Sequence, residues 1–405
     1  MDIVFQRKVD RVAGTLICRV LSLLNRLRRE GVPPRTQKIL VVLLSEMGAL
    51  VLARPMLARL KTLYPEAELH ALVFRQNKEV LDLLDVVPGS NILTVRNDTF
   101  THLLRDCLKA LRHTRKMCID TVIDCELFSR ISSILSLLSG AEKRVGFHPH
   151  TQEGLYRGDF INRPVLYNPY QHIARQFITL GEAIDAVGAP RVKRLSDDDT
   201  LKIVPVAPDR EEVGAMMSRL KADFPSVLGK SLVLAYPGGG LLPIRAWPLD
   251  NYRVVAGELI REGYAVGVIG LKEDKPLARA MQSHCGETSC IDLTGYTKTV
   301  RELLLVFHFA SLLITNDGGP VHFASMTPIP SIVFYGPETP ILYGPLDEKS
   351  HTFYTNLSCS PCLTAYNHRN SPCDGNNVCL RTIQPEAVMR TTREILKDRE
   401  GIRIL

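Results

Sequence analysis

The stretch KILVVLL, residues 38–44, is a continuous run of aliphatic side chains behind a single lysine. It lacks the alternation of polar and apolar residues that marks a strand with one solvated face. An uninterrupted apolar run of this length is typical of a parallel strand buried on both faces. Gly48 and an apolar helical pattern over residues 52–64 follow it. The stretch therefore predicts a strand and helix unit, and with it an α/β fold.

Apolar runs and helical patterns alternate along the rest of the chain. Further strands are expected at 68–74, 91–95, 121–124, 231–236, 265–269, 289–292, 312–315 and 331–335, and further helices at 210–223, 252–262, 276–284 and 299–309. The intervening segment 188–208 is rich in Pro, Asp and Arg, which is typical of a linker. We therefore predict four parts: a basic N-terminal helix in 1–35, α/β domains in 36–205 and 206–385, and a C-terminal helix and tail in 386–405.

Composition and charge exclude several classes of protein. The 405 residues are 45% hydrophobic and 23% charged, which excludes a disordered, collagen-like or disulfide-scaffold chain. The formal net charge is +7, and residues 1–35 alone carry +5 of it. A nucleic-acid-binding domain spreads its cations over a folded face and uses aromatic stacking platforms, whereas this chain has one Trp. We expect no nucleic-acid partner.

The basic N-terminal segment has the pattern of an amphipathic helix. Its apolar residues recur every three or four positions: Val9, Val12, Leu16, Val20, Leu23 and Leu27. The apolar window is too short to cross a bilayer and contains Arg19, and no signal cleavage site follows. We therefore expect a cytoplasmic protein whose residues 1–30 contact the anionic inner face of the cytoplasmic membrane. A helix packed on its own domain or on a protein partner is the alternative.

A glycine-rich turn follows the first strand of the second domain. Residues 237–240 read PGGG directly after SLVLAY, and Arg245 lies shortly beyond. Backbone without side chains lets a ligand approach closely. The turn lacks the lysine of a P-loop and the spacing of a dinucleotide fingerprint. It predicts either a phosphate site with Arg245 as counter-charge or an ordinary turn.

A second glycine turn, NDGG at 316–319, follows the strand expected at 312–315 and opens a helix near Pro320. Free N–H groups at such a helix start attract an anion, for example a diphosphate. The alternatives are that Asp317 caps the helix and that His322 is a packed core histidine.

Several motifs in this order resemble glycosyltransferase family 9, the heptosyltransferase-like enzymes that build bacterial lipopolysaccharide cores. They are KILVVLLSEMGALVLARPMLARLKTLYP, PGGG with RAWP, NDGGPVHFAS with FYGPETP and YGP, and a closing cysteine-rich stretch, together spanning about residues 36–395. The resemblance implies a GT-B architecture, in which two Rossmann-like α/β domains face a central cleft. The N-terminal domain is then the acceptor domain, and the C-terminal domain binds a nucleoside-diphosphate sugar.

The resemblance also assigns donor-binding residues. Asp317, Gly319 and His322 match the family's Asp-x-Gly-x-x-His turn, and Gly318 stands where threonine is usual. Arg245 resembles the basic residue before Trp-Pro, and Glu273 or its neighbour Asp274 resembles the acid that receives the ribose. The implied donor set is Gly238, Gly239, Gly240, Arg245, Glu273, Asp317, Gly318, Gly319 and His322.

One position departs from the family pattern. In the family's Ser-x-x-Gly-Asp opening the Asp is the expected general base, but here Gly48 is followed by Ala49. A methyl group cannot accept a proton, and a general base contributes roughly 10²- to 10⁴-fold in rate. Glu46, on the same turn, is the nearest carboxylate. We predict that Glu46 is the substitute base; a purely structural glutamate is the alternative.

Four cysteines cluster near the end of the chain: Cys359, Cys362, Cys373 and Cys379. In a reducing cytosol this spacing is more typical of zinc or iron ligands than of disulfides. It predicts a structural zinc or iron site, with His368 as an alternative ligand. The competing interpretation is a cysteine-rich loop without metal.

The leading interpretation is an inverting glycosyltransferase. It would transfer a sugar from a nucleoside diphosphate, with ADP-heptose as the expected donor, to a lipid-linked, lipopolysaccharide-type or other cell-surface glycan. We expect no catalytic metal, because helix dipoles and side chains neutralise the leaving diphosphate in enzymes of this fold. Ala49 favours a catalytically impaired nucleotide-sugar-binding scaffold or regulator as the alternative. A nucleotide-sugar epimerase of the same architecture is a third possibility.

Overall fold

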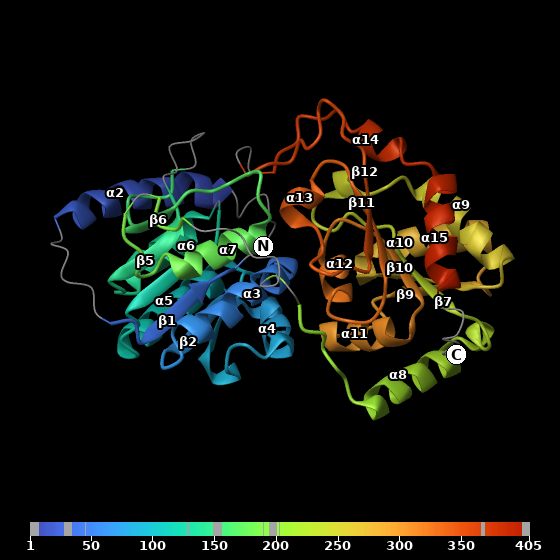
Figure 1. Cartoon of the computed structure of the whole chain (residues 1–405), viewed down its shortest axis with the longest axis horizontal. Helices are drawn as coiled ribbons and strands as arrows, with labels where there is room; N and C mark the ends of the chain where they lie inside the picture. Colours follow the sequence, from blue (N-terminus) through green and yellow to red (C-terminus); the bar gives the residue numbers. More distant parts are fainter. Residues whose placement is uncertain are drawn as a thin grey trace. The chain divides into compact units, whose positions relative to one another are not determined.

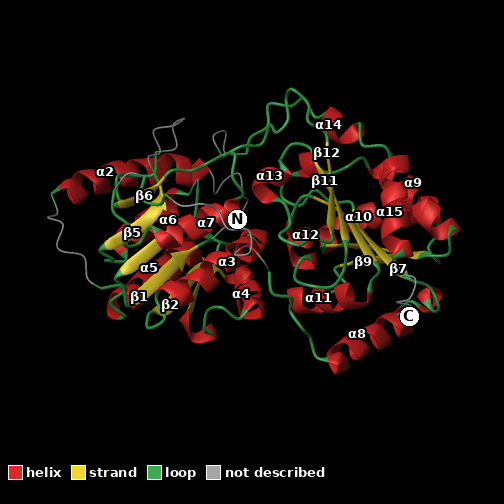
Figure 2. Cartoon of the chain, in the orientation of Figure 1, coloured by secondary structure: helices red, strands yellow, loops and turns green. Residues whose placement is uncertain are grey.

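The computed structural model describes residues 8–27, 35–44, 46–127, 129–148, 156–188, 190–193, 201, 203–365 and 369–398. The chain divides into two compact units, Met1–Lys202 and Ile203–Leu405. Each unit contains one six-stranded sheet with helices packed against it (Figures 1 and 2). The predicted α/β class is confirmed, whereas the domain boundaries given above stay predictions.

The first sheet has the strand order β3-β2-β1-β4-β5-β6, and all its pairs are parallel. Its strands are β1 (Lys38–Val42), β2 (Glu68–Phe74), β3 (Ile92–Val95), β4 (Thr121–Asp124), β5 (Lys143–Phe147) and β6 (Arg163–Val165). The accompanying helices are α2 (Thr15–Arg26), α3 (Met47–Leu63), α4 (Lys78–Leu84), α5 (Phe100–Lys116), α6 (Arg130–Leu138) and α7 (Ile173–Glu182). The aliphatic run that predicted the fold forms β1, which lies in the middle of this sheet.

Two strands of the first sheet were not predicted. Strands β5 and β6 begin with cations, so their sequences do not read as apolar runs. The Lys143 ammonium at the start of β5 is buried and lies 2.6 Å from an Asp185 carboxylate oxygen. This ion pair lets a charged residue occupy a buried strand position, because a buried cation needs a partner.

The second sheet is also fully parallel, with the order β12-β11-β10-β7-β8-β9. Its strands are β7 (Leu232–Tyr236), β8 (Ala265–Gly270), β9 (Cys290–Thr294), β10 (Leu312–Asn316), β11 (Ser331–Tyr335) and β12 (Ser350–Tyr354). Its helices are α8 (Arg210–Asp223), α9 (Leu249–Arg261), α10 (Lys275–Cys285), α11 (Val300–Phe309), α12 (Gly319–Ala324), α13 (Pro340–Tyr343), α14 (Val378–Arg381) and α15 (Pro385–Lys397).

The core of the second unit fixes the start of α9 against the sheet. Trp247, the chain's one tryptophan, is buried and stacks on Phe334 of β11 with 4.3 Å between ring centroids. Its indole N–H donates to the Ile383 carbonyl at 3.0 Å.

Strand β12 was not predicted. It is a half-exposed edge strand with the sequence SHTFY, and its polar residues do not form an apolar run.

Candidate functional site

The order of the second sheet identifies where a ligand would bind. From β7 the chain runs outward through β8 and β9, then returns to the other side of β7 and continues through β10, β11 and β12. In open α/β sheets ligands bind at the carboxyl ends of the strands beside such a reversal point. Thr315 of β10 pairs with Tyr236 of β7, so the two predicted glycine turns leave the sheet at the same level.

A buried amide, which we did not predict, holds the two turns together. The Asn316 side chain is fully buried, and its Nδ2 donates to the Gly238 carbonyl at 2.9 Å and the Tyr236 carbonyl at 3.3 Å. Its Oδ1 accepts from the Trp247 backbone N–H at 2.8 Å. Asn316 therefore fixes the glycine turn and the segment after Arg245 relative to β10.

The turn at 238–240 has little room for side chains. A Cβ at Gly239 would lie 2.7 Å from the Pro243 Cα, and Gly240 has a φ of +59°. Both features favour glycine over any L residue. Tyr236 lies beneath the turn, and burial, followed by the Asp274 carboxylate, raises the pKa of Tyr236 to about 12. The phenol is therefore neutral at physiological pH and keeps its O–H.

The two turns meet through an ion pair. An Arg245 Nη1 lies 3.4 Å from an Asp317 carboxylate oxygen, and these side chains are only 12% and 5% exposed. The buried Nε of Arg245 has no hydrogen-bond partner in the described part of the chain. A largely buried cation with an unused donor is suited to binding an anion beside the glycine turn.

The helix after the second turn is short. Helix α12 spans Gly319–Ala324, six residues, so its dipole is weaker than that of a long helix. His322 is buried on this helix, and its carbonyl accepts from the Ser325 hydroxyl at 2.7 Å. The structure thus brings Gly318, Gly319 and His322 to the same strand ends as Arg245 and Asp317.

The two acids after β8 differ in their surroundings. Asp274 accepts from the Leu271 backbone N–H at 2.8 Å, and its other carboxylate oxygen would be 3.1 Å from a Cβ at Gly238. Glu273 lies in the same 3₁₀ turn, Lys272–Asp274, and is exposed. Asp274 therefore lies against the glycine turn, while the Glu273 carboxylate faces solvent.

In the first unit the reversal point lies between β1 and β4, and Glu46 follows β1 there. Glu46 is half-buried at the position that precedes α3, and its carbonyl accepts from the Ala49 N–H at 3.1 Å. A second carboxylate, Glu126, lies buried after β4 and accepts from the Leu44 N–H at 2.7 Å. We did not predict Glu126; its position after a buried strand is the signal that could have identified it.

The four cysteines lie in the segment between β12 and α14 and in α14 itself. Cys379 is buried against Gly336, while Cys359 and Cys373 are exposed. Burial raises the pKa of the Cys379 thiol. Within the described ranges, however, no three Cys, His, Asp or Glu side chains are arranged to hold a metal ion. His368 lies outside the described residues.

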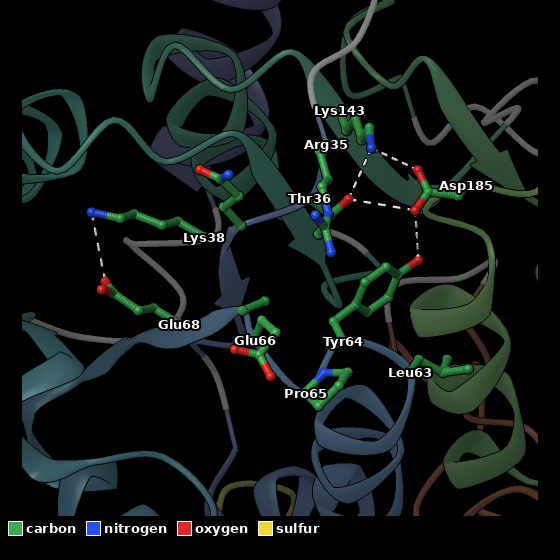
Figure 3. Close-up of a pocket in the computed structure, with 12 residues that line it drawn as sticks. Arg35, Thr36, Lys38, Leu63, Tyr64, Pro65, Glu66, Glu68, Lys143 and Asp185 are labelled. Carbon is green, nitrogen blue, oxygen red and sulfur yellow. Dashed lines mark hydrogen bonds and ion pairs between the residues drawn. The ribbon is translucent and has the colours of Figure 1, made fainter.

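A pocket of about 850 Å³ lies at the opposite, amino edge of the first sheet (Figure 3). Its polar groups bind one another: the Lys143 ammonium and the Tyr64 hydroxyl both contact the Asp185 carboxylate, at 2.6 and 3.0 Å. Because ligands of such sheets bind at the carboxyl ends of the strands, we do not assign the donor to this pocket.

The family model described as glycosyltransferase family 9 (heptosyltransferase) matches residues 108–371, more than half of the chain. Lipooligosaccharide heptosyltransferase 2 of Haemophilus ducreyi is 22% identical over 77% of this chain and 87% of that protein. The Haemophilus influenzae enzyme of the same name is 30% identical, but the match covers only 31% of this chain and 37% of that relative.

Solved structures of low sequence identity share the fold. The Escherichia coli ADP-heptose lipopolysaccharide heptosyltransferase II is similar with a TM-score of 0.69 and 19% identity, covering 90% of this chain and 100% of that one. TibC of enterotoxigenic Escherichia coli, an iron-containing dodecameric glycosyltransferase, is similar with a TM-score of 0.52 and 15% identity, covering 91% and 78%. The GT-B expectation agrees with these likenesses.

Proposed function

Because this chain belongs to glycosyltransferase family 9, the heptosyltransferases, we propose that it transfers a heptose from a nucleoside-diphosphate donor to a glycan hydroxyl. ADP-heptose is the proposed donor, since a structural neighbour is an ADP-heptose enzyme. A lipopolysaccharide-type or other cell-surface glycan is the proposed acceptor. The observation that carries the proposal is the Arg245 and Asp317 pair beside two glycine turns.

The proposed donor site neutralises the leaving diphosphate without a metal ion. Arg245 offers an unpartnered, buried Nε, and the turns at 238–240 and 318–319 consist of glycines at the same strand ends, where no side chain of their own blocks a ligand. A diphosphate that binds Arg245 competes with Asp317 for the guanidinium. Donors fixed before the reaction stabilise the charge that develops as the bond to the sugar breaks.

The proposed reaction is an inverting displacement. The acceptor oxygen attacks the anomeric carbon, the bond from that carbon to the diphosphate oxygen breaks, and the bonding pair leaves with the diphosphate. The acceptor proton passes to the Glu46 carboxylate, which takes the place of the aspartate that Ala49 replaces. The position of Glu46 supports this role, because Glu46 follows the central strand β1 at the reversal point of the first sheet.

The donor assignment can be tested by calorimetry with ADP and ADP-heptose. We expect Arg245→Gln to weaken ADP binding by about 10- to 100-fold, because a hydrogen bond to a charged group contributes roughly 1.5–3 kcal/mol. The matched control is Arg253→Gln, since Arg253 binds Asp250 and the Ala280 carbonyl elsewhere in the unit. Equal ADP affinity in both variants would place the donor elsewhere.

Ala49 supports a second candidate function, a nucleotide-sugar-binding scaffold or regulator. Such a protein would bind the donor at the same site but would not transfer the sugar to an acceptor. It predicts ADP-heptose binding that Arg245→Gln weakens, with no product formed from any membrane-derived acceptor. Product formation in wild-type protein excludes it.

We also propose one structural zinc or iron ion at the cysteine cluster. Support comes from the spacing of Cys359, Cys362, Cys373 and Cys379 in the sequence and from the iron in TibC. In this proposal the ion would join the loop after β12 to α14 and would take no part in sugar transfer.

A further inference from the structure

Helix α2 and the helical turn Asp10–Gly14 before it pack on their own unit through Leu21 and through small and polar residues. The small and polar residues are Gly14, Cys18 and Ser22, which recur every four positions. A Cβ at Gly14 would lie 3.0 Å from the Arg130 Cβ of α6, and Cys18 is fully buried. The Ser22 hydroxyl lies 2.9 Å from the Tyr156 hydroxyl. These contacts determine which side of the helix faces the protein.

Both ends of this segment are fixed as well. The Asp10 carboxylate accepts from the backbone N–H groups of Arg130 and Ile131, each at 3.0 Å, and so occupies the first turn of α6. At the other end an Arg26 Nη2 lies 3.1 Å from the Asp159 carboxylate. The orientation of α2 is therefore set by contacts along its whole length.

The opposite side of α2 presents large apolar side chains to solvent. These exposed residues are Leu16, Val20 and Leu23, together with Val12 in the helical turn Asp10–Gly14 that precedes α2 and Leu27 at its C-terminal end. Leu16 and Leu23 are 65% and 64% exposed. A surface helix of a globular protein normally buries its apolar stripe and exposes its polar one. Helix α2 packs Cys18 and Leu21 against its own unit, but its larger apolar side chains stay exposed, so they are available to a partner.

A second helix extends this surface. Helix α6 contacts both α2 and α5. On α5, Phe100, Leu104 and Leu108 are exposed. Leu104 and Leu108 share a helix side with Arg115, whose Nε donates to the Leu138 carbonyl of α6 at 2.9 Å. We name the exposed apolar residues of α2 and α5 the α2–α5 surface.

Cations border the α2–α5 surface. Arg19 of α2 and Arg105, Lys109, Arg112 and Lys116 of α5 are exposed. Helix α2 has no acidic residue, and the single acid of α5, Asp106, is paired with Arg96 at 2.7 Å. The surface therefore combines exposed leucines with uncompensated positive charge.

We propose that the α2–α5 surface docks on an anionic lipid bilayer, with its apolar side chains in the interface and its cations at the headgroups. Anionic headgroups complement these cations, whereas a symmetric second copy would bring like charges together. No helix in the described part of the chain is long and apolar enough to cross a membrane. Docking parallel to the bilayer plane is the geometry that remains for α2. The proposal does not depend on the proposed catalytic function.

Vesicle co-sedimentation of the full chain tests the proposal. We expect wild-type protein to sediment with vesicles that contain phosphatidylglycerol and to remain in solution with pure phosphatidylcholine. Leu16→Gln combined with Leu23→Gln should weaken sedimentation by at least about ten-fold, because two exposed leucines no longer enter the interface. Arg19→Gln combined with Lys109→Gln should weaken it by about five-fold for each lost charge.

The matched control is Leu228→Gln combined with Val254→Gln, which changes exposed apolar residues of the second unit and should leave sedimentation unchanged. The substituted residues on α2 and α5 are exposed, so folding is retained, and circular dichroism checks this. Equal vesicle binding of all variants overturns the proposal. So does a wild-type dimer that Leu16→Gln and Leu23→Gln dissociate, because a second copy would then cover the surface.

Discussion

At the scale of single residues, Asn316 determines the geometry of the proposed donor site. Asn316→Ala removes two donated bonds and two accepted bonds in a fully buried position. Since each unsatisfied buried group costs roughly 1–3 kcal/mol, we expect the free energy of unfolding to fall by about 3 kcal/mol. Urea unfolding measures this. Folded Asn316→Ala should also bind ADP more weakly, and unchanged ADP affinity would contradict the positioning role.

The proposed proton transfer to Glu46, at a site where Ala49 replaces the family's aspartate, is tested at the same scale. We expect Glu46→Gln to lower kcat by roughly 10²- to 10⁴-fold while ADP affinity stays unchanged, because the amide cannot accept the acceptor's proton. Glu126→Gln is the matched control: it removes a nearby carboxylate but keeps an oxygen that accepts the Leu44 N–H. Single-turnover assays with ADP-heptose measure the rates. Wild-type turnover in Glu46→Gln would show that Glu46 is structural.

At the scale of elements, the strands with apolar runs were predictable, whereas β5, β6 and β12, which begin with charged or polar residues, were missed. Strands β1, β7 and β10 read directly from their aliphatic runs. Strands β5 and β6 start with cations whose ion pairs or polar contacts come from distant segments, as with Lys143 and Asp185. Such long-range pairing leaves no signal in the local sequence pattern. Part of the candidate site could not be predicted for the same reason. The glycine turns follow from strand ends, whereas the role of Asn316 depends on contacts with residues 236–247.

The cysteine segment before and within α14 carries an element-scale prediction. We expect plasma emission spectrometry of purified protein to find close to one zinc or iron ion per chain. Cys359→Ser combined with Cys362→Ser should lose that ion, because two of four thiolate ligands are gone. Cys118→Ser, which changes an exposed cysteine of the first unit, is the control and should keep it. Clearly substoichiometric metal in the wild type would contradict the prediction.

At the scale of the whole molecule, the proposed activities belong to different units. The donor turns lie in Ile203–Leu405, and the α2–α5 surface lies in Met1–Lys202. Helix α2 also precedes the region that the family model matches. The net charge follows this division, because +5 of the +7 falls in residues 1–35. The proposed membrane docking should therefore be separable from donor binding.

Hydrogen exchange can measure that separation on the intact chain. ADP should protect backbone amides at 237–247 and 315–323, because a ligand that binds only the folded state lowers local opening. Phosphatidylglycerol vesicles should instead protect amides of α2 and α5, which lie under the bilayer in the proposed docking. Arg245→Gln should abolish only the first pattern, and Leu16→Gln with Leu23→Gln only the second. Protection of α2 by ADP alone would show that the two sites are coupled, and their independence would then be wrong.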